Sequence, residues 1–135
     1  MQKLWRWSAV IAWMAAIFIF SSRQNLPEPH RAVWELLLYN GAHFAEYAVV
    51  GALLVLALSA HRSIPRRSAY LAAFLLATLY GLGDEIHQAF VPTRTCDVRD
   101  LLVDAAGAGG AVLATLAWRR RGRRAGEPAR PQVSV

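Results

Sequence analysis

The sequence lacks several features that common protein classes require. It has a single cysteine, Cys96, so no disulfide can form within the chain. Residues 68–83 have no polar face at helical spacing, which argues against a soluble bundle of amphipathic helices. No A-x-A cleavage pattern follows the apolar run that ends at Phe20, which argues against a cleaved secretory signal. These absences leave an integral membrane protein as the favoured class.

Long apolar runs dominate what is present. Hydrophobic residues make up 56% of the 135 residues, which exceeds the usual content of soluble domains. Four runs approach the length that a helix needs to cross a bilayer, at about 7–22, 41–60, 68–83 and 101–118. The sequence therefore predicts one all-α membrane domain over 1–118, built from four transmembrane helices.

Two further segments have an expected structure of their own. Residues 29–40 begin with Pro29 and carry apolar side chains, so we expect a short interfacial helix that anchors the chain or covers a site as a lid. Residues 119–135 are rich in arginine, and we expect them to form a disordered basic tail that contacts anionic lipid.

Basic residues are distributed unevenly between the two ends of the spans. Eleven of the fifteen lysines and arginines lie before span one, between spans two and three, or after span four. The other four lie toward the opposite side with eight of the nine acidic residues, six of which are in the two remaining connections and two, Glu46 and Asp104, in the adjoining span ends. By the positive-inside rule, both termini lie in the cytoplasm and the acidic connections face outside. Because the positive charge serves topology, it does not favour nucleic acid as a partner.

Polar side chains recur at helical spacing near the outer ends of three spans. They are His43, Glu46 and Tyr47 in "NGAHFAEYAVVG", Asp84, Glu85, His87 and Gln88 in "GLGDEIHQAF", and Asp97, Asp100 and Asp104 in "TRTCDVRDLLVDAAG". Residues three or four positions apart share one helix face. Since ionisable groups that point at lipid are strongly disfavoured, we expect the three polar faces to meet.

Helix ends account for part of this pattern. Thr95 or Asp97 can cap the N-terminus of span four. Asp84 and Glu85 lie toward the C-terminal end of span three, where the helix dipole disfavours negative charge. Asp104 lies too deep for a cap, so these three carboxylates need other partners. The cations available to them are Arg94, Arg99, His43 and His87.

The order of these blocks resembles that of the VanZ-like family of small bacterial membrane proteins. The resemblance is carried by "AHFAEYAVVGALL", "GDEIHQAFVPTR" and "DVRDLLVDAAGAGGA", and it covers residues 21 to about 114. The matching positions are His43, Tyr47, Asp84, Glu85, Gln88, Pro92, Arg94, Asp100 and Gly107. Two positions depart from the family pattern, because Thr93 stands in place of the usual glycine and Asp104 in place of the usual asparagine.

The resemblance implies a protein of the bacterial cell membrane with four spans and an outward-facing polar cluster. The family takes its name from a member linked to resistance to the glycopeptide antibiotic teicoplanin. The motifs themselves do not reveal a mechanism, so resistance enters here only as a property that the family name implies.

Three functions remain for the polar cluster. We favour binding of an outer-leaflet lipid, a cell-wall precursor or a glycopeptide. The residues expected to bind it are His43, Glu46, Tyr47, Asp84, Glu85, Gln88, Arg94, Asp100 and Asp104. Acidic residues outnumber arginines on this side eight to four, so an anionic ligand would need a bridging cation.

The second function is that of a metal-dependent enzyme acting on an envelope lipid, with carboxylates that collect Mg²⁺ or Ca²⁺ as its cofactor. No serine or threonine of the cluster has an obvious base at a suitable spacing, which weakens this alternative. The third is a structural network of ion pairs and hydrogen bonds without a ligand.

The glycine-rich stretch that begins at Gly107 is interpreted as a packing surface. It lacks the Lys-Ser/Thr pair of a phosphate loop and lies inside a span. Gly107 and Ala111 are one helical turn apart, so we expect another helix to approach this face closely.

The topology predicts that Cys96 is reached from outside the cell. A membrane-impermeant thiol reagent added to intact cells should label it, because the connection between spans three and four faces outside. Opened cells and denatured protein are the controls for sidedness and for burial. Labelling that requires opened cells would invert the topology.

Overall fold

The computed structural model describes residues 2–24 and 33–125. These residues form four helices and no strand, namely α1 Gln2–Ser21, α2 Val33–Leu58, α3 Arg66–Gln88 and α4 Val98–Ala125. All four helices are long and apolar enough to cross a membrane. The predicted all-α fold with four transmembrane helices is therefore confirmed.

The helices extend beyond the apolar runs that predicted them. Residues 33–40, expected to belong to a separate interfacial helix, are instead the first turns of α2, while 29–32 lie outside the described residues. No proline interrupts 33–58, so the helix continues without a break. The helix α4 continues to Ala125, so it includes the first residues of the segment that was expected to be disordered. Arginine is a good helix former, which explains this extension.

Local chemistry explains where α3 and α4 begin. Pro65 precedes α3 with ψ of 138°, and its missing N–H is not needed at this position. Asp97 precedes α4, and its Oδ1 accepts a hydrogen bond from the backbone N–H of Arg99 at 2.8 Å. This is the geometry of an N-terminal cap, so one of the two caps expected for span four is confirmed.

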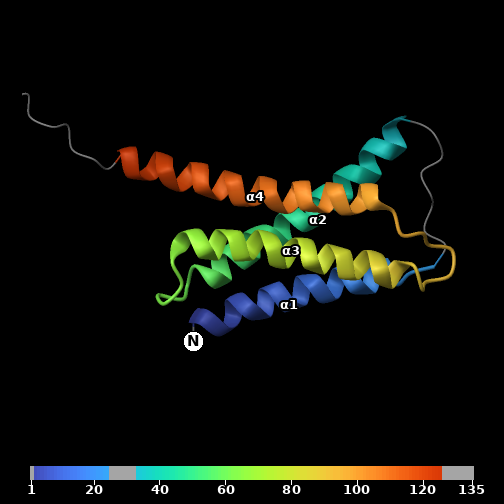
Figure 1. Ribbon diagram of the computed structural model, residues 1–135, viewed down its shortest axis with the longest axis horizontal. Coiled ribbons are helices and arrows are strands. Elements are labelled where there is room, and N and C mark those ends of the chain that lie inside the picture. Colours follow the sequence, from blue (N-terminus) through green and yellow to red (C-terminus); the bar gives the residue numbers. More distant parts are fainter. Residues whose placement is uncertain (1, 25–32, 126–135) are drawn as a thin grey trace, which may run out of the picture.

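Successive helices run in opposite directions through the bundle (Figure 1). The C-terminal ends of α1 and α3 therefore lie at the same end as the N-terminal ends of α2 and α4. α2 and α4 share the most extensive interface, whereas α1 packs mainly on α2 and does not contact α4 within the described residues. The three polar segments are brought to one end, and the turn from α2 to α3 lies at the other.

Small residues face inward and large ones face outward on α3. Ala69, Ala73 and Ala77 are fully buried at 0% exposure, while Leu71 and Leu79 are about 60% exposed on the other side of the helix. A water-soluble protein would bury its leucines. In a bilayer the leucines can face lipid, and small residues let helix backbones approach each other closely.

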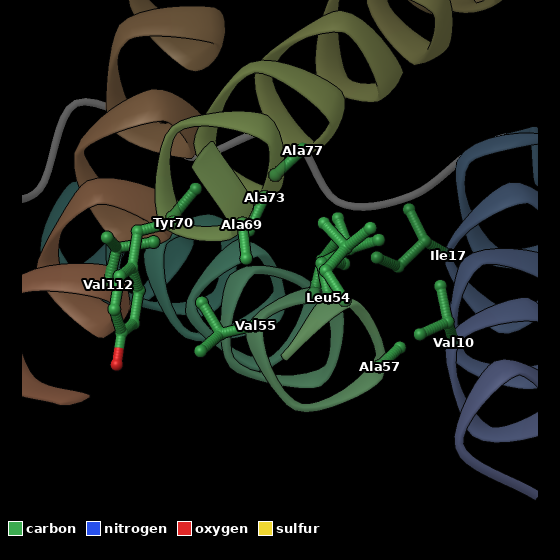
Figure 2. Close-up of a cluster of buried hydrophobic side chains, with 13 residues drawn as sticks. Val10, Ile17, Leu54, Val55, Ala57, Ala69, Tyr70, Ala73, Ala77 and Val112 are labelled. Carbon is green, nitrogen blue, oxygen red and sulfur yellow. The ribbon is translucent and has the colours of Figure 1, made fainter. Parts of the chain in front are cut away.

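The apolar core lies around α2. Figure 2 shows Val10 and Ile17 of α1 on one side of Leu54 of α2, and Val112 of α4 beside Tyr70 of α3 on the other. All five are buried, so α2 is the helix against which the other three are assembled.

Glycine permits the close crossing of α2 and α4. A Cβ on Gly107 would overlap the backbone carbonyl oxygen of Phe44, and a Cβ on Gly51 would lie 2.9 Å from the carbonyl oxygen of Ala108. Neither contact can be relieved by rotating a side chain, because both involve backbone atoms. The expected packing role of Gly107 is thus confirmed, and α2 is its partner.

The substitution Gly107→Ala should weaken the bundle. Its methyl group forces α2 and α4 apart, so we expect the free energy of unfolding to fall by about 1 to 3 kcal/mol. Gly83→Ala is the matched control, since a Cβ there meets nothing within 4 Å and alanine favours the helix. Unfolding in sodium dodecyl sulfate, followed by circular dichroism, measures both. Equal stabilities would contradict the assigned crossing.

Candidate functional site

A cavity of about 260 Å³ lies at the polar end of the bundle, between α1, α2, α3 and the loop that leads to α4. Its wall consists of Ile17, Phe20, Ser21, Tyr39, Ala42, His43, Glu46, Tyr47, Asp84, Gln88 and Arg94. Six of the nine residues predicted from the sequence are in this wall. The other three, Glu85, Asp100 and Asp104, are buried but do not line the cavity.

Asp84 is held by two side-chain donors. The hydroxyl of Ser21 donates to Oδ1 at 2.6 Å, and Nε2 of Gln88 donates to Oδ2 at 3.0 Å. Hydrogen bonds to a buried carboxylate offset the loss of its hydration. These bonds compensate for the unfavourable interaction of Asp84 with the helix dipole near the C-terminal end of α3. The bond from Ser21 also connects α1 to α3.

Glu85 is held by the backbone that leads into α4. Its Oε2 accepts a hydrogen bond from the N–H of Asp97 at 2.9 Å, while its Oε1 is buried without a partner among the described residues. Because the bond spans the loop between α3 and α4, Glu85 fixes the distance between these two helices.

Two side-chain pairs join α2 to α4. The hydroxyl of Tyr39 donates to Oδ2 of Asp100 at 2.9 Å, and Nδ1 of His43 lies 3.1 Å from Oδ1 of Asp104. His43 was among the cations expected to partner the deep carboxylates. An asparagine at position 104 would also carry an Oδ1 that can accept a hydrogen bond from the His43 ring, so the charge of Asp104 is not needed for this bond.

Tyr47 lies deeper in the cavity wall and is 1% exposed. Its ring fits against Gly81, where a Cβ would stand 3.1 Å from Cε1 of Tyr47. The Tyr47 hydroxyl is buried and has no hydrogen-bond partner among the described residues. Buried hydroxyl groups are nearly always paired, so this one requires an explanation.

Arg94 and Glu46 lie in the same wall and are also unpaired. The Nε of Arg94 is buried without a partner, and no ion pair joins its guanidinium group to a carboxylate within 2–24 and 33–125. The backbone carbonyl of Glu46 accepts a hydrogen bond from Trp13 at 3.1 Å, but its carboxylate accepts none from the described residues.

A tight turn sets the position of Arg94. Its N–H donates to the carbonyl of Val91 at 3.1 Å, with Pro92 second in the turn and Thr93 third at φ of 71°. Proline followed by a positive φ is the pattern of a type II turn, in which glycine is preferred at the third position. The glycine usual in the family at this position thus has a conformational reason, and Thr93 adopts the same left-handed conformation.

His87 does not line the cavity. Its ring lies 4.5 Å from that of Phe18, and its Nε2 lies 3.0 Å from the hydroxyl of Ser22. The Ser22 hydroxyl donates to the carbonyl of Phe18 at 2.6 Å, which leaves its oxygen free to accept a hydrogen bond from the histidine nitrogen in the tautomer that carries the proton there. A general base would instead accept the proton of serine, and here that proton is already directed to the carbonyl of Phe18.

The carboxylates suggested for Mg²⁺ or Ca²⁺ are engaged separately. Among the described residues, no three of the histidine, cysteine, aspartate and glutamate side chains come together as a group that could hold a metal ion. Asp84, Asp100 and Asp104 instead bond to Ser21 and Gln88, to Tyr39 and to His43 respectively.

Two polar residues of the cavity wall were not predicted as part of the site. Ser21 ends α1, and Tyr39 lies in the first turns of α2. Their positions in the chain could have indicated them, because the predicted topology places the end of span one and the start of span two on the same side as the acidic residues.

The fold and the cavity define a small four-helix membrane protein with a polar site at one end of the bundle. Comparison with family models agrees, because the VanZ/LLP1 model matches residues 6–119. The chain belongs to this family, as the motifs predicted, and the match includes most of each of the four helices. No curated protein and no solved structure matches the chain.

Removing the unpaired hydroxyl of Tyr47 should not weaken the fold. In Tyr47→Phe we expect an unfolding free energy equal to or above that of the parent protein, because the buried hydroxyl loses no hydrogen bond. Tyr80→Phe is the control, since its hydroxyl donates to the carbonyl of Met14 at 2.6 Å. Its loss should lower stability by about 0.5 to 1.5 kcal/mol.

Both variants are compared by detergent unfolding. A clear loss of stability in Tyr47→Phe would mean that its hydroxyl has a partner within the protein.

Proposed function

We propose that this protein binds the polar head group of an outer-leaflet component of the bacterial cell envelope in the cavity between α1, α2 and α3. The ligand is a membrane lipid or a lipid-linked cell-wall precursor. The proposal includes the plasma membrane as its location and the positive-inside orientation, which turns the cavity outward.

Unpaired polar atoms in the cavity wall carry this proposal. The hydroxyl of Tyr47 and Nε of Arg94 are both buried, both without a partner among the described residues, and both belong to residues of the same wall. An unpaired buried polar group costs about 1 to 3 kcal/mol. A ligand that accepts hydrogen bonds from both donors would remove these penalties.

The size of the cavity limits the ligand. Pockets for drug-sized molecules measure about 300 to 1,000 Å³, so a space of about 260 Å³ suits a head group better than a whole glycopeptide. Any contribution to teicoplanin resistance would then arise from holding an envelope component that the drug needs, and not from enclosing the drug.

The other polar residues support the cavity. Asp84, Asp100 and Asp104 have partners on other helices or on their own helix, so their bonds stabilise the wall before a ligand arrives. The structural network considered from the sequence is thus compatible with binding, because different residues perform the two tasks.

The test is the amount of lipid that remains with the purified protein. We expect lipid to be retained after extensive washing in an uncharged detergent, and at least tenfold less of it with Arg94→Gln, since a hydrogen bond to a charged group is worth about 1.5 to 3 kcal/mol. Tyr47→Phe should also retain less.

Arg99→Gln is the matched control, because Arg99 is exposed and does not line the cavity. Retained lipid is extracted and quantified by mass spectrometry, and added lipid-linked wall precursor and teicoplanin are compared by the same assay. Equal retention by all four proteins would reject the proposal.

A further inference from the structure

The cavity wall carries one unbonded group of each charge. Among the described residues that line it, Glu46 is the carboxylate without a hydrogen bond and Arg94 is the guanidinium without one. Asp84, the other carboxylate of the wall, already accepts bonds from Ser21 and Gln88. New polar contacts are therefore available at Glu46 and Arg94.

These two groups do not neutralise each other. No ion pair joins the carboxylate of Glu46 to the guanidinium of Arg94 within 4.0 Å, although both line a space of only about 260 Å³. Opposite charges near an apolar medium attract strongly, so a direct bond would be expected if the two side chains could reach each other. Both residues line the cavity without forming an ion pair, so the wall offers a negative group and a positive group.

We propose that the ligand is a dipolar head group in which an ammonium group and a phosphate are joined by a short linker, as in an aminophospholipid. Glu46 accepts hydrogen bonds from the ammonium group, and Arg94 donates to the phosphate. The hydroxyl of Tyr47 supplies a further donor. This inference rests on the proposed function and specifies its ligand.

Simpler ligands fit the wall less well. A purely anionic head group satisfies Arg94 but leaves Glu46 facing another negative charge, so it would need the bridging cation considered from the sequence. A simple cation satisfies Glu46 and is repelled by Arg94. A dipolar head group satisfies both residues without an additional ion.

The remainder of the wall suits a lipid. Ile17 and Phe20 of α1 and Ala42 of α2 contribute apolar surface, and Phe20 and Ala42 are also exposed on the outside of the bundle. Both helices are long and apolar enough to span the membrane. Acyl chains can therefore remain among the bilayer lipids while the head group enters the cavity.

The inference is tested with three lipids that carry identical acyl chains. Phosphatidylethanolamine has an ammonium group with N–H donors, phosphatidylcholine has a trimethylated group without them, and phosphatidylglycerol has no ammonium group. Each is titrated into the delipidated full chain in an uncharged detergent, and bound lipid is counted by native mass spectrometry. We expect phosphatidylethanolamine to bind at least about tenfold more tightly than the other two, which corresponds to one charge-assisted hydrogen bond.

Two variants test which residue binds the ammonium group and which binds the phosphate. Glu46→Gln should remove the preference for phosphatidylethanolamine and leave binding of phosphatidylglycerol unchanged or stronger. Arg94→Gln should weaken binding of all three lipids, while Arg99→Gln behaves as the parent protein. Retained binding of phosphatidylglycerol also shows that Glu46→Gln is folded.

The outcomes separate this inference from the proposed function. If phosphatidylglycerol binds as tightly as phosphatidylethanolamine and both depend on Arg94, the cavity binds lipid but the dipolar ligand is wrong. An unchanged preference for phosphatidylethanolamine in Glu46→Gln would also mean that the dipolar ligand is wrong. If no lipid responds to Arg94→Gln, both the inference and the proposed function are wrong.

Discussion

The structure depends on one constraint, which is that a carboxylate near the apolar part of a bilayer must find its donors within the protein. The deeply placed acidic residues find these donors on other helices. Asp84 bonds to α1 through Ser21, and Asp100 and Asp104 bond to α2 through Tyr39 and His43. The polar bonds thus set the register of the helices at one end of the bundle, as small residues do along the rest of it.

Three polar residues of the cavity wall are not used by this network. Glu46, Tyr47 and Arg94 lie beside bonded residues but make no side-chain hydrogen bonds of their own among the described residues. Rigid neighbours hold them in place, since Tyr47 packs on Gly81 and a tight turn at Thr93 precedes Arg94. A fixed wall reduces the ordering that a ligand must impose, which favours binding.

Sequence patterns predicted what depends on local spacing. The four spans, the polar helix faces and the cap at Asp97 follow from periodicity and end chemistry, and all three appear in the structure. His43 was among the cations expected for Asp104, but the other partners did not follow, because Tyr39 and Asp100 are 61 positions apart and Ser21 and Asp84 are 63 apart. Such pairs depend on how the helices pack, and a single sequence does not specify that packing.

The apolar part of the cavity wall has a kinetic consequence. Phe20 is exposed on a helix that is long and apolar enough to cross a membrane, so under the proposed function a lipid would reach the cavity by diffusing within its leaflet and would not need to pass through water. Occupancy of the proposed site would then be governed by the surface density of the lipid, expressed as a mole fraction of the leaflet. A change in membrane composition would alter the fraction of occupied protein at once, even where the amount of protein in the cell stays constant.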